Sequence, residues 1–203
     1  FQMIGAFFAL FATGPQQIAL MVNFMSVFSS AFTILFLFWT LTLLLQKLPS
    51  FKTLVSVYER IGFFGSAVVG SLAFCFSDSF WFSAVEAEVY AMAAFIMSVL
   101  FYAGLRWERE MFDPRGDKWV VLIAFVVGLS FGVHFMGLLT IPAIGFLYFF
   151  KNYKKVTVKN FLIANVATVA ILLFIFKLLL PMTLRFFSAS EIFFVNTLNM
   201  PFN

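Results

Sequence analysis

The sequence contains very few of the residues on which disulfide-bonded, zinc-binding and water-soluble proteins depend. It has one cysteine, Cys75, and one histidine, His134. A disulfide within the chain is therefore excluded, and so is a zinc site built from Cys and His side chains alone. Charged residues make up only 11% of the chain, against about 25% in soluble domains. The sequence also lacks GxxxxGK[ST] and GxGxxG motifs and a recognisable Ser-His-Asp set, so nucleotide-binding loops and acyl-transfer triads have no support.

Apolar residues take the place of the missing charges. Hydrophobic residues form 63% of the 203 residues, Phe alone supplies 33 of them, and the mean hydropathy is +1.03. A compact aqueous core could not hide so many apolar side chains, so we expect an all-α, polytopic integral membrane protein. The net charge of +4 comes from short basic clusters between the apolar runs. This pattern predicts membrane lipid as a partner and no nucleic acid.

Long apolar runs mark the expected spans, since a membrane helix needs about 20 mainly apolar residues. Four runs each predict one span: 18–45, 61–76, 85–105 and 161–180. A fifth run, 119–150, would be about 48 Å long as one helix, well beyond a hydrocarbon core of about 30 Å. We therefore expect a helical hairpin, 119–133 and 136–150, that bends at His134. The expected total is six spans.

The basic residues predict how the spans are oriented. Loops 46–60, 106–118 and 151–159 hold 11 of the 13 Lys and Arg residues, and these residues are retained on the cytoplasmic side of a membrane. We expect the three loops in the cytoplasm, and the 77–84 connection and the His134 bend on the outer face. The 106–118 loop has nearly balanced charge, which predicts ion pairs between residues four apart.

The two ends of the chain carry no span of their own. We expect residues 1–13 to form an interfacial helix, because their apolar run is too short to cross a membrane. Residues 18–180 would hold the six spans and 181–203 an extracytoplasmic tail, all within a single transmembrane domain, 1–203. The chain begins with Phe1 and shows no signal peptide, so we expect an internal fragment of a longer protein.

Small residues four positions apart occur in two of the expected spans. Gly128 and Gly132 form a GxxxG pair, and Ser66 and Gly70 form a second small pair. Such pairs allow helix backbones to approach closely within a membrane. They predict a packed bundle.

Carboxylates cluster in and just after the outer 77–84 connection. Asp78, Glu86 and Glu88 lie within 11 residues and have no basic neighbour. If Glu86 and Glu88 lie on one helix, their side chains point about 200° apart, and Glu86 shares a polar strip with Ser83 and Tyr90. We expect Glu86 to face a cavity, because ionisable groups at membrane depth usually line cavities or find partners. The alternative is that both glutamates are solvated residues favoured by the N-terminal helix dipole.

Further side chains are candidates near this connection and at the outer face. Asp78 is expected as an N-cap or turn residue, and the expected cavity-lining residues are Asp78, Trp81 and Tyr90. His134 can contact an anionic headgroup or transfer a proton, although a lone histidine at a helix end is more often capped by backbone. Lys177 and Arg185 can attract phosphate at the outer surface, and the alternative for both is topology anchoring.

Two segments resemble a known family. Residues 73–91, with the core FWFSAVEAEVYA, and residues 128–139, with the sequence GLSFGVHFMGLL, are similar to blocks of a bacterial family of multi-span inner-membrane proteins of formerly unknown function. That family is related to the protein O-mannosyltransferases, and a vertebrate protein O-mannosyltransferase belongs with it.

The resemblance implies a GT-C-type glycosyltransferase with its active face outside the cytoplasm, in the bacterial inner membrane. Its donor would be a polyprenyl-phosphate-linked sugar and its acceptor a protein Ser or Thr hydroxyl. Glu86 and Glu88 match the family's acidic pair and become the candidate catalytic residues, and His134 falls near the lipid phosphate. The main catalytic base would lie in an acidic loop upstream of Phe1. The resemblance implies no further cofactor, and a divalent metal is possible but has no support from the residues.

Two other functions fit the composition. One is a transporter or flippase for a lipid-linked substrate, and the other is a structural subunit of a membrane complex. Transporters often show inverted repeats and charges at the bilayer midplane. Here no repeat is visible, and the expected charges lie at the outer mouth, which favours surface chemistry.

Overall fold

Helices account for all the regular structure in residues 1–53 and 56–201, the part of the chain that this computed structural model describes. The prediction of an all-α fold is confirmed. The chain forms two compact units, Phe1–Lys151 and Asn152–Asn203, which are described one at a time. Residues 54–55 of the predicted 46–60 loop and residues 202–203 of the predicted tail lie outside the described residues.

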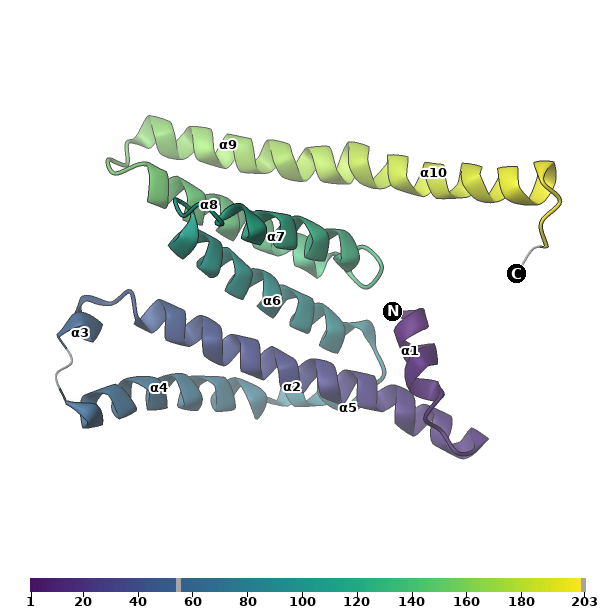
Figure 1. The fold of residues 1–203 in the computed structure, drawn as a ribbon, viewed down its shortest axis with the longest axis horizontal. Helices are drawn as coiled ribbons and strands as arrows, with labels where there is room; N and C mark the ends of the chain where they lie inside the picture. Colours follow the sequence, from purple (N-terminus) through teal and green to yellow (C-terminus); the bar gives the residue numbers. More distant parts are fainter. Residues whose placement is uncertain (54–55, 202–203) are drawn as a thin grey trace. The chain divides into compact units, whose positions relative to one another are not determined.

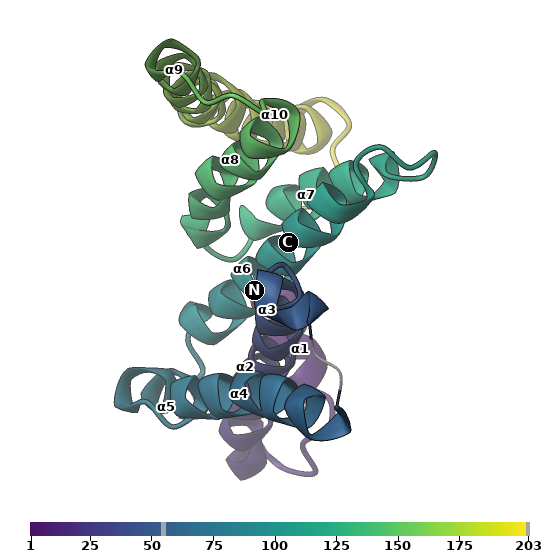
Figure 2. The ribbon, with the colours of Figure 1, turned by 90° about the vertical axis from the view of Figure 1, so that its left-hand side faces the viewer.

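Helix α2, Ile18–Leu45, is the centre of the first unit. Its bounds are those predicted from hydropathy, and no charged residue interrupts it. It lies between α4 and α6 (Figures 1 and 2) and packs most extensively against α6. Its buried face carries small hydroxyl residues, and the hydroxyls of Ser29 and Thr33 donate to the carbonyls of Met25 and Ser29, each at 2.8 Å. These internal bonds satisfy hydroxyls that apolar neighbours could not.

Two short helices flank α2. Helix α1, Gln2–Ala9, packs on α2, and the 3-10 turn η1, Pro15–Gln17, connects the two helices. A helix was predicted here, and its interfacial position stays a prediction. Helix α3, Pro49–Lys52, follows the end of α2.

Helices α4, Val57–Cys75, and α5, Asp78–Val85, form a bent pair. The predicted span began later, at residue 61, because the capping box at Ser56 was missed. Ser56 and Glu59 exchange side-chain to backbone hydrogen bonds of 2.9 and 3.1 Å, which starts the helix at Val57. The pair bends by 65° after α4. The predicted 77–84 connection is therefore mostly helical.

Helix α6, Val89–Glu110, runs in the same direction as α2 (Figure 1). The predicted span, 85–105, is displaced toward the N-terminus, since the helix begins only at Val89. Its small buried residues Ala91, Ala93, Ala103 and Gly104 permit close packing against its neighbours.

The predicted division of the apolar run 119–150 at His134 is confirmed. That both arms of the hairpin cross the membrane stays a prediction, because only the second arm is long enough by itself. Helix α7, Asp117–Ser130, is followed by a turn that ends at His134, then by the 3-10 helix η2, Phe135–Leu139, and by α8, Thr140–Asn152. Gly137 of η2 lies so close to α7 that an added Cβ would be 2.8 Å from the Cβ of Ser130. The close packing of η2 on α7 after the bend at His134 therefore requires glycine at position 137.

The second unit is one long helical segment. Helix α9, Val158–Phe174, continues through the π-helical turn η3, Ile175–Leu179, into α10, Leu180–Ile192, and the π-helical turn η4, Phe193–Thr197. Pro181 lies at the start of α10, where it lacks an N–H and crowds the carbonyl four residues earlier. The carbonyl that Pro181 would crowd belongs to Lys177, which lies in η3. A π-helical turn is wider than an α-helical one. Helix continues through most of the predicted 181–203 tail.

Among the described residues, 1–53 and 56–201, four helical segments are long and apolar enough to cross a membrane, and the bent pair α4–α5 can supply a fifth. The four are Pro15–Leu45, Val89–Glu110, Phe135–Asn152 and Val158–Thr197. A polytopic helical membrane protein is thus confirmed. The total of six spans stays a prediction, because α7 has 14 residues and is only about 21 Å long.

Candidate functional site

The acidic connection between α5 and α6 is extended. Glu86 follows the last residue of α5 with φ −108° and ψ 139°, and Glu88 precedes α6 with φ −112° and ψ 166°. The Glu88 N–H donates to the Glu86 carbonyl at 2.8 Å, which closes a three-residue turn. The prediction that both glutamates lie on one helix is wrong, and so is the polar strip predicted for Glu86, because Ser83 and Tyr90 belong to different helices.

The two glutamates differ in exposure. Glu86 is half-buried, whereas Glu88 is exposed. Asp78 is also exposed, and it occupies the first turn of α5, with Ser77 before it as the capping residue. An acidic side chain at that place is favoured by the helix dipole. Of the three carboxylates, Glu86 is the one that the fold partly removes from solvent.

A hollow of about 510 Å³ lies beside α5. Its lining includes Asp78 and Trp81, together with Phe76, Phe82 and Val85. The Trp81 ring stacks on Phe76 with centroids 5.8 Å apart. This gives the hollow an aromatic wall and one carboxylate.

His134 caps the N-terminus of η2. Its Nδ1 accepts the Met136 N–H at 3.2 Å. In the neutral ring the proton is therefore assigned to Nε2, which is left as a donor. The ring lies against Tyr90, with centroids 5.7 Å apart, so the fold brings the start of α6 to the hairpin bend.

Lys177 and Arg185 belong to the second unit. Lys177 lies in η3 and Arg185 in α10, and both are exposed. They stay candidates for phosphate contact.

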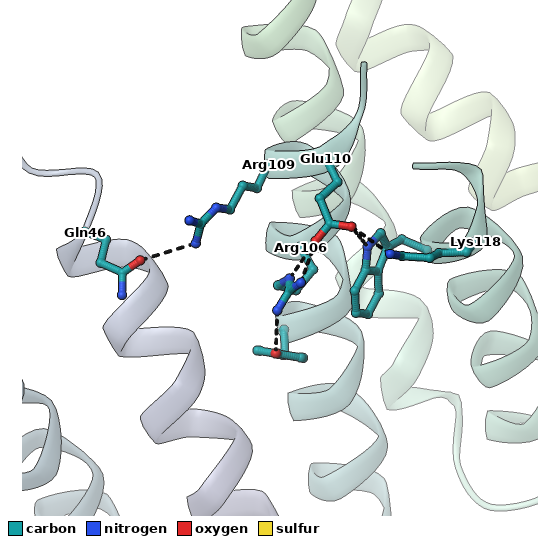
Figure 3. Close-up of polar contacts among 7 residues, drawn as sticks. Gln46, Arg106, Arg109, Glu110 and Lys118 are labelled. Carbon is teal, nitrogen blue, oxygen red and sulfur yellow. Dashed lines mark hydrogen bonds and ion pairs between the residues drawn. The ribbon is translucent and has the colours of Figure 1, made fainter. Parts of the chain in front are cut away.

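Charged side chains gather at the other end of α6. Glu110 accepts two bonds from Arg106, at 3.1 and 2.5 Å, one from the indole N–H of Trp119 at 2.8 Å and one from Lys118 at 2.9 Å. Figure 3 shows Arg106 and Lys118 converging on Glu110 from α6 and α7. The predicted i,i+4 ion pairing is confirmed by Arg106 and Glu110.

The long-range partners at this end were not predicted from the sequence. Glu108 pairs with Lys47 after α2, and with Lys151 of α8 at 3.5 Å. These pairs tie together the ends of α2, α6 and α8, each next to a basic loop. The signal available in the sequence was the position of Glu108 and Glu110 inside a basic cluster.

The acidic connection and the ion pairs of Glu108 and Glu110 are therefore separated by the length of α6. Its 22 residues correspond to about 33 Å, the thickness of a hydrocarbon core. Glu108 and Glu110 form their ion pairs at the C-terminal end of α6. Glu88 precedes its N-terminal end, where Tyr90 contacts His134. Within residues 1–53 and 56–201, no group of three or more His, Cys, Asp and Glu side chains is arranged to hold a metal ion.

Comparison with known families gives one match. Residues 1–157 match the family described as the protein O-mannosyl-transferase TMEM260 N-terminal domain. The chain belongs to this family. The matched residues include both segments that suggested the resemblance, and they cover the first unit with little beyond it. None of the curated proteins and none of the solved structures compared with the chain matches it. The predicted relation to protein O-mannosyltransferases is confirmed, while a bacterial origin and the fragment status stay predictions.

Proposed function

We propose that the chain is part of a membrane glycosyltransferase that moves a sugar from a polyprenyl-phosphate donor to a Ser or Thr hydroxyl of a protein. Its family membership supports this class of activity. Within the fold, the proposal is supported by the contact between the His134 ring and Tyr90, which follows Glu88 by two residues. Carboxylates and a phosphate-binding donor are the groups that such a transfer needs.

The acceptor hydroxyl, the sugar, the phosphate and a carboxylate each have a separate role in the reaction. The acceptor oxygen attacks C1 of the sugar, the bond between C1 and the phosphate oxygen breaks, and the hydroxyl proton passes to a carboxylate. Glu86 and Glu88 are the candidate carboxylates of this chain. General-base assistance of this kind contributes roughly 10²–10⁴-fold to the rate.

The leaving polyprenyl phosphate carries negative charge and needs donors. His134 supplies Nε2–H, because its Nδ1 is engaged with the Met136 N–H. Lys177 and Arg185 are proposed separately as cationic contacts to a phosphate or lipid headgroup, since positive groups stabilise negative charge. We place this end of the first unit on the extracytoplasmic face of an inner membrane, with the basic loops inside.

Replacement of Glu86 tests the proposal. In membranes that contain the full-length enzyme of which we expect this chain to be a part, Glu86→Gln is expected to lower sugar transfer from a polyprenyl-phosphate mannose donor to a Ser/Thr peptide by at least about 100-fold. The protein should still insert and accumulate normally, because the amide keeps the size of the side chain. The measurement is radiolabelled sugar in the peptide, normalised to the amount of protein.

Asp113→Asn is the matched control, since Asp113 is an exposed carboxylate in the loop at the other end of α6. It should leave transfer unchanged. Unaltered activity in a well-expressed Glu86→Gln protein would contradict the assignment of Glu86.

A further inference from the structure

A second hollow lies at the end of the first unit that holds the ion pairs. It has a volume of about 550 Å³ and lies where α2, α3, α6 and α8 end or begin. We call it the basic-end pocket. Its polar lining residues are Gln46, Lys47, Glu108, Arg109 and Lys151, and its apolar ones are Leu43, Phe51 and Leu105.

The charges in this pocket do not balance. Lys47, Arg109 and Lys151 supply three positive charges, and Glu108 supplies one negative charge. Glu108 already accepts from both lysines and its side chain is only 15% exposed. An excess of two positive charges therefore faces the hollow.

The cationic groups have unused donors. Arg109 makes one long bond, 3.4 Å, from Nη1 to the neutral amide oxygen of Gln46, which crosses from α6 to α2 (Figure 3). A guanidinium carries five N–H donors in a planar fork that matches phosphate. Lys47 and Lys151 keep side-chain exposures of 42% and 29%, so a ligand can reach both.

We propose that the basic-end pocket binds the phosphate of an anionic phospholipid headgroup. Two positive charges and a planar donor fork are suited to a phosphate, and the apolar side chains of Leu43, Phe51 and Leu105 place the site at the border between polar and apolar surface. The bound phosphate would tie α2 to α6 and α8 through a charge that the chain itself does not supply. The site is at the opposite end of α6 from Glu86, so it stands apart from the proposed transfer reaction.

Native mass spectrometry of the detergent-purified full chain tests the proposal. Short-chain phosphatidylglycerol and phosphatidylcholine are added in separate titrations, with inorganic phosphate as a third. We expect one phosphatidylglycerol per chain at saturation and weaker, non-saturating retention of phosphatidylcholine. Saturable binding of inorganic phosphate alone, with no preference between the two lipids, would assign the pocket to a soluble anion and overturn the lipid proposal.

The double variant Arg109→Gln, Lys151→Gln is expected to lower the affinity for phosphatidylglycerol by about 30-fold, because each basic residue near an anionic lipid contributes roughly a fivefold preference. Arg115→Gln with Lys155→Gln is the control, since both residues are exposed and neither lines the pocket. An equal loss in the control would show attraction by net charge alone and contradict the site. If the double variant does not fold, the wild-type titration still decides, because absence of a saturable, phosphatidylglycerol-selective stoichiometry overturns the proposal.

Discussion

His134 is a residue whose backbone contact determines its chemistry. The Met136 N–H occupies Nδ1, so the proton of the neutral ring lies on Nε2, and the direction of the ring is fixed by the cap. Contact with Tyr90 supports the ring from α6. A structural role and a binding role are therefore combined in one side chain.

Two substitutions separate these roles. Asparagine at a cap position still offers an oxygen to the backbone two residues on, but it has no donor at the place of Nε2. We expect His134→Asn to keep the thermal midpoint of the protein and to raise the KM for the polyprenyl-phosphate donor about tenfold. His134→Ala should raise the KM similarly and also destabilise the protein by about 1 kcal/mol, the usual cost of a lost cap.

Donor titrations together with thermal melts provide the check. A normal KM for the donor in the His134→Asn protein would show that His134 caps η2 and does not contact the donor.

The sequence predicts that the candidate carboxylates and the histidine share one membrane face, because that inference depends only on the alternation of basic loops. It could not reveal that Tyr90 reaches His134. That contact joins α6 to η2, and it depends on how the hairpin folds back, which no local pattern encodes.

At the scale of helices, the break between α5 and α6 shows why one boundary was misplaced. Residues 77–92 contain neither Gly nor Pro, and Ala and Glu favour helix continuation. The chain nevertheless becomes extended at Glu86 and Glu88, because α5 and α6 each pack on α2 as separate helices. Tertiary packing outweighs local propensity here, whereas α2 has an uninterrupted apolar run and no competing signal.

Glycines give a second example, and a prediction. The GxxxG glycine Gly128 has open space where a Cβ would be, whereas Gly137 would place a Cβ 2.8 Å from the Ser130 Cβ and 3.4 Å from Leu100. Ser130 and Leu100 are fully buried, and the Ser130 hydroxyl is held by the Val127 carbonyl at 2.6 Å. These neighbours cannot easily move, so we expect Gly137→Ala to destabilise the protein by about 1–3 kcal/mol.

Gly128→Ala is the matched control in the same hairpin. It should be neutral or stabilising by up to about 1 kcal/mol, since alanine favours helix more than glycine does. Thermal unfolding in detergent compares the two proteins. A Gly137→Ala protein as stable as the Gly128→Ala protein would show that η2 is not closely packed on α7.

At the scale of the first unit, the charges are arranged by end. At one end of α6, Glu108 and Glu110 form ion pairs with lysines next to the basic loops. The acidic connection lies at the other end of α6 (Figure 1). The positive-inside rule then predicts which end faces the cytoplasm.

Cysteine labelling in sealed bacterial spheroplasts checks this orientation. In a Cys75→Ser background, a cysteine at Ala87 is expected to react with a membrane-impermeant maleimide added outside, and a cysteine at Asp113 only after detergent is added. Both positions are exposed, so both should react fully in detergent, which controls for accessibility. Labelling of Asp113→Cys from outside, with Ala87→Cys protected, would reverse the orientation and remove the proposed extracytoplasmic site.

The shortness of α7 has a consequence for the lipid around it. If α7 crosses the membrane, its length of about 21 Å falls short of a hydrocarbon core of about 30 Å, and the bilayer must thin or its headgroups must sink beside the helix. The bend at His134 would then lie at the bottom of a dimple in the outer leaflet. If the proposed reaction is correct, its lipid-linked donor would then reach His134 with the lowered leaflet surface, so local thinning of the membrane would bring donor and histidine together.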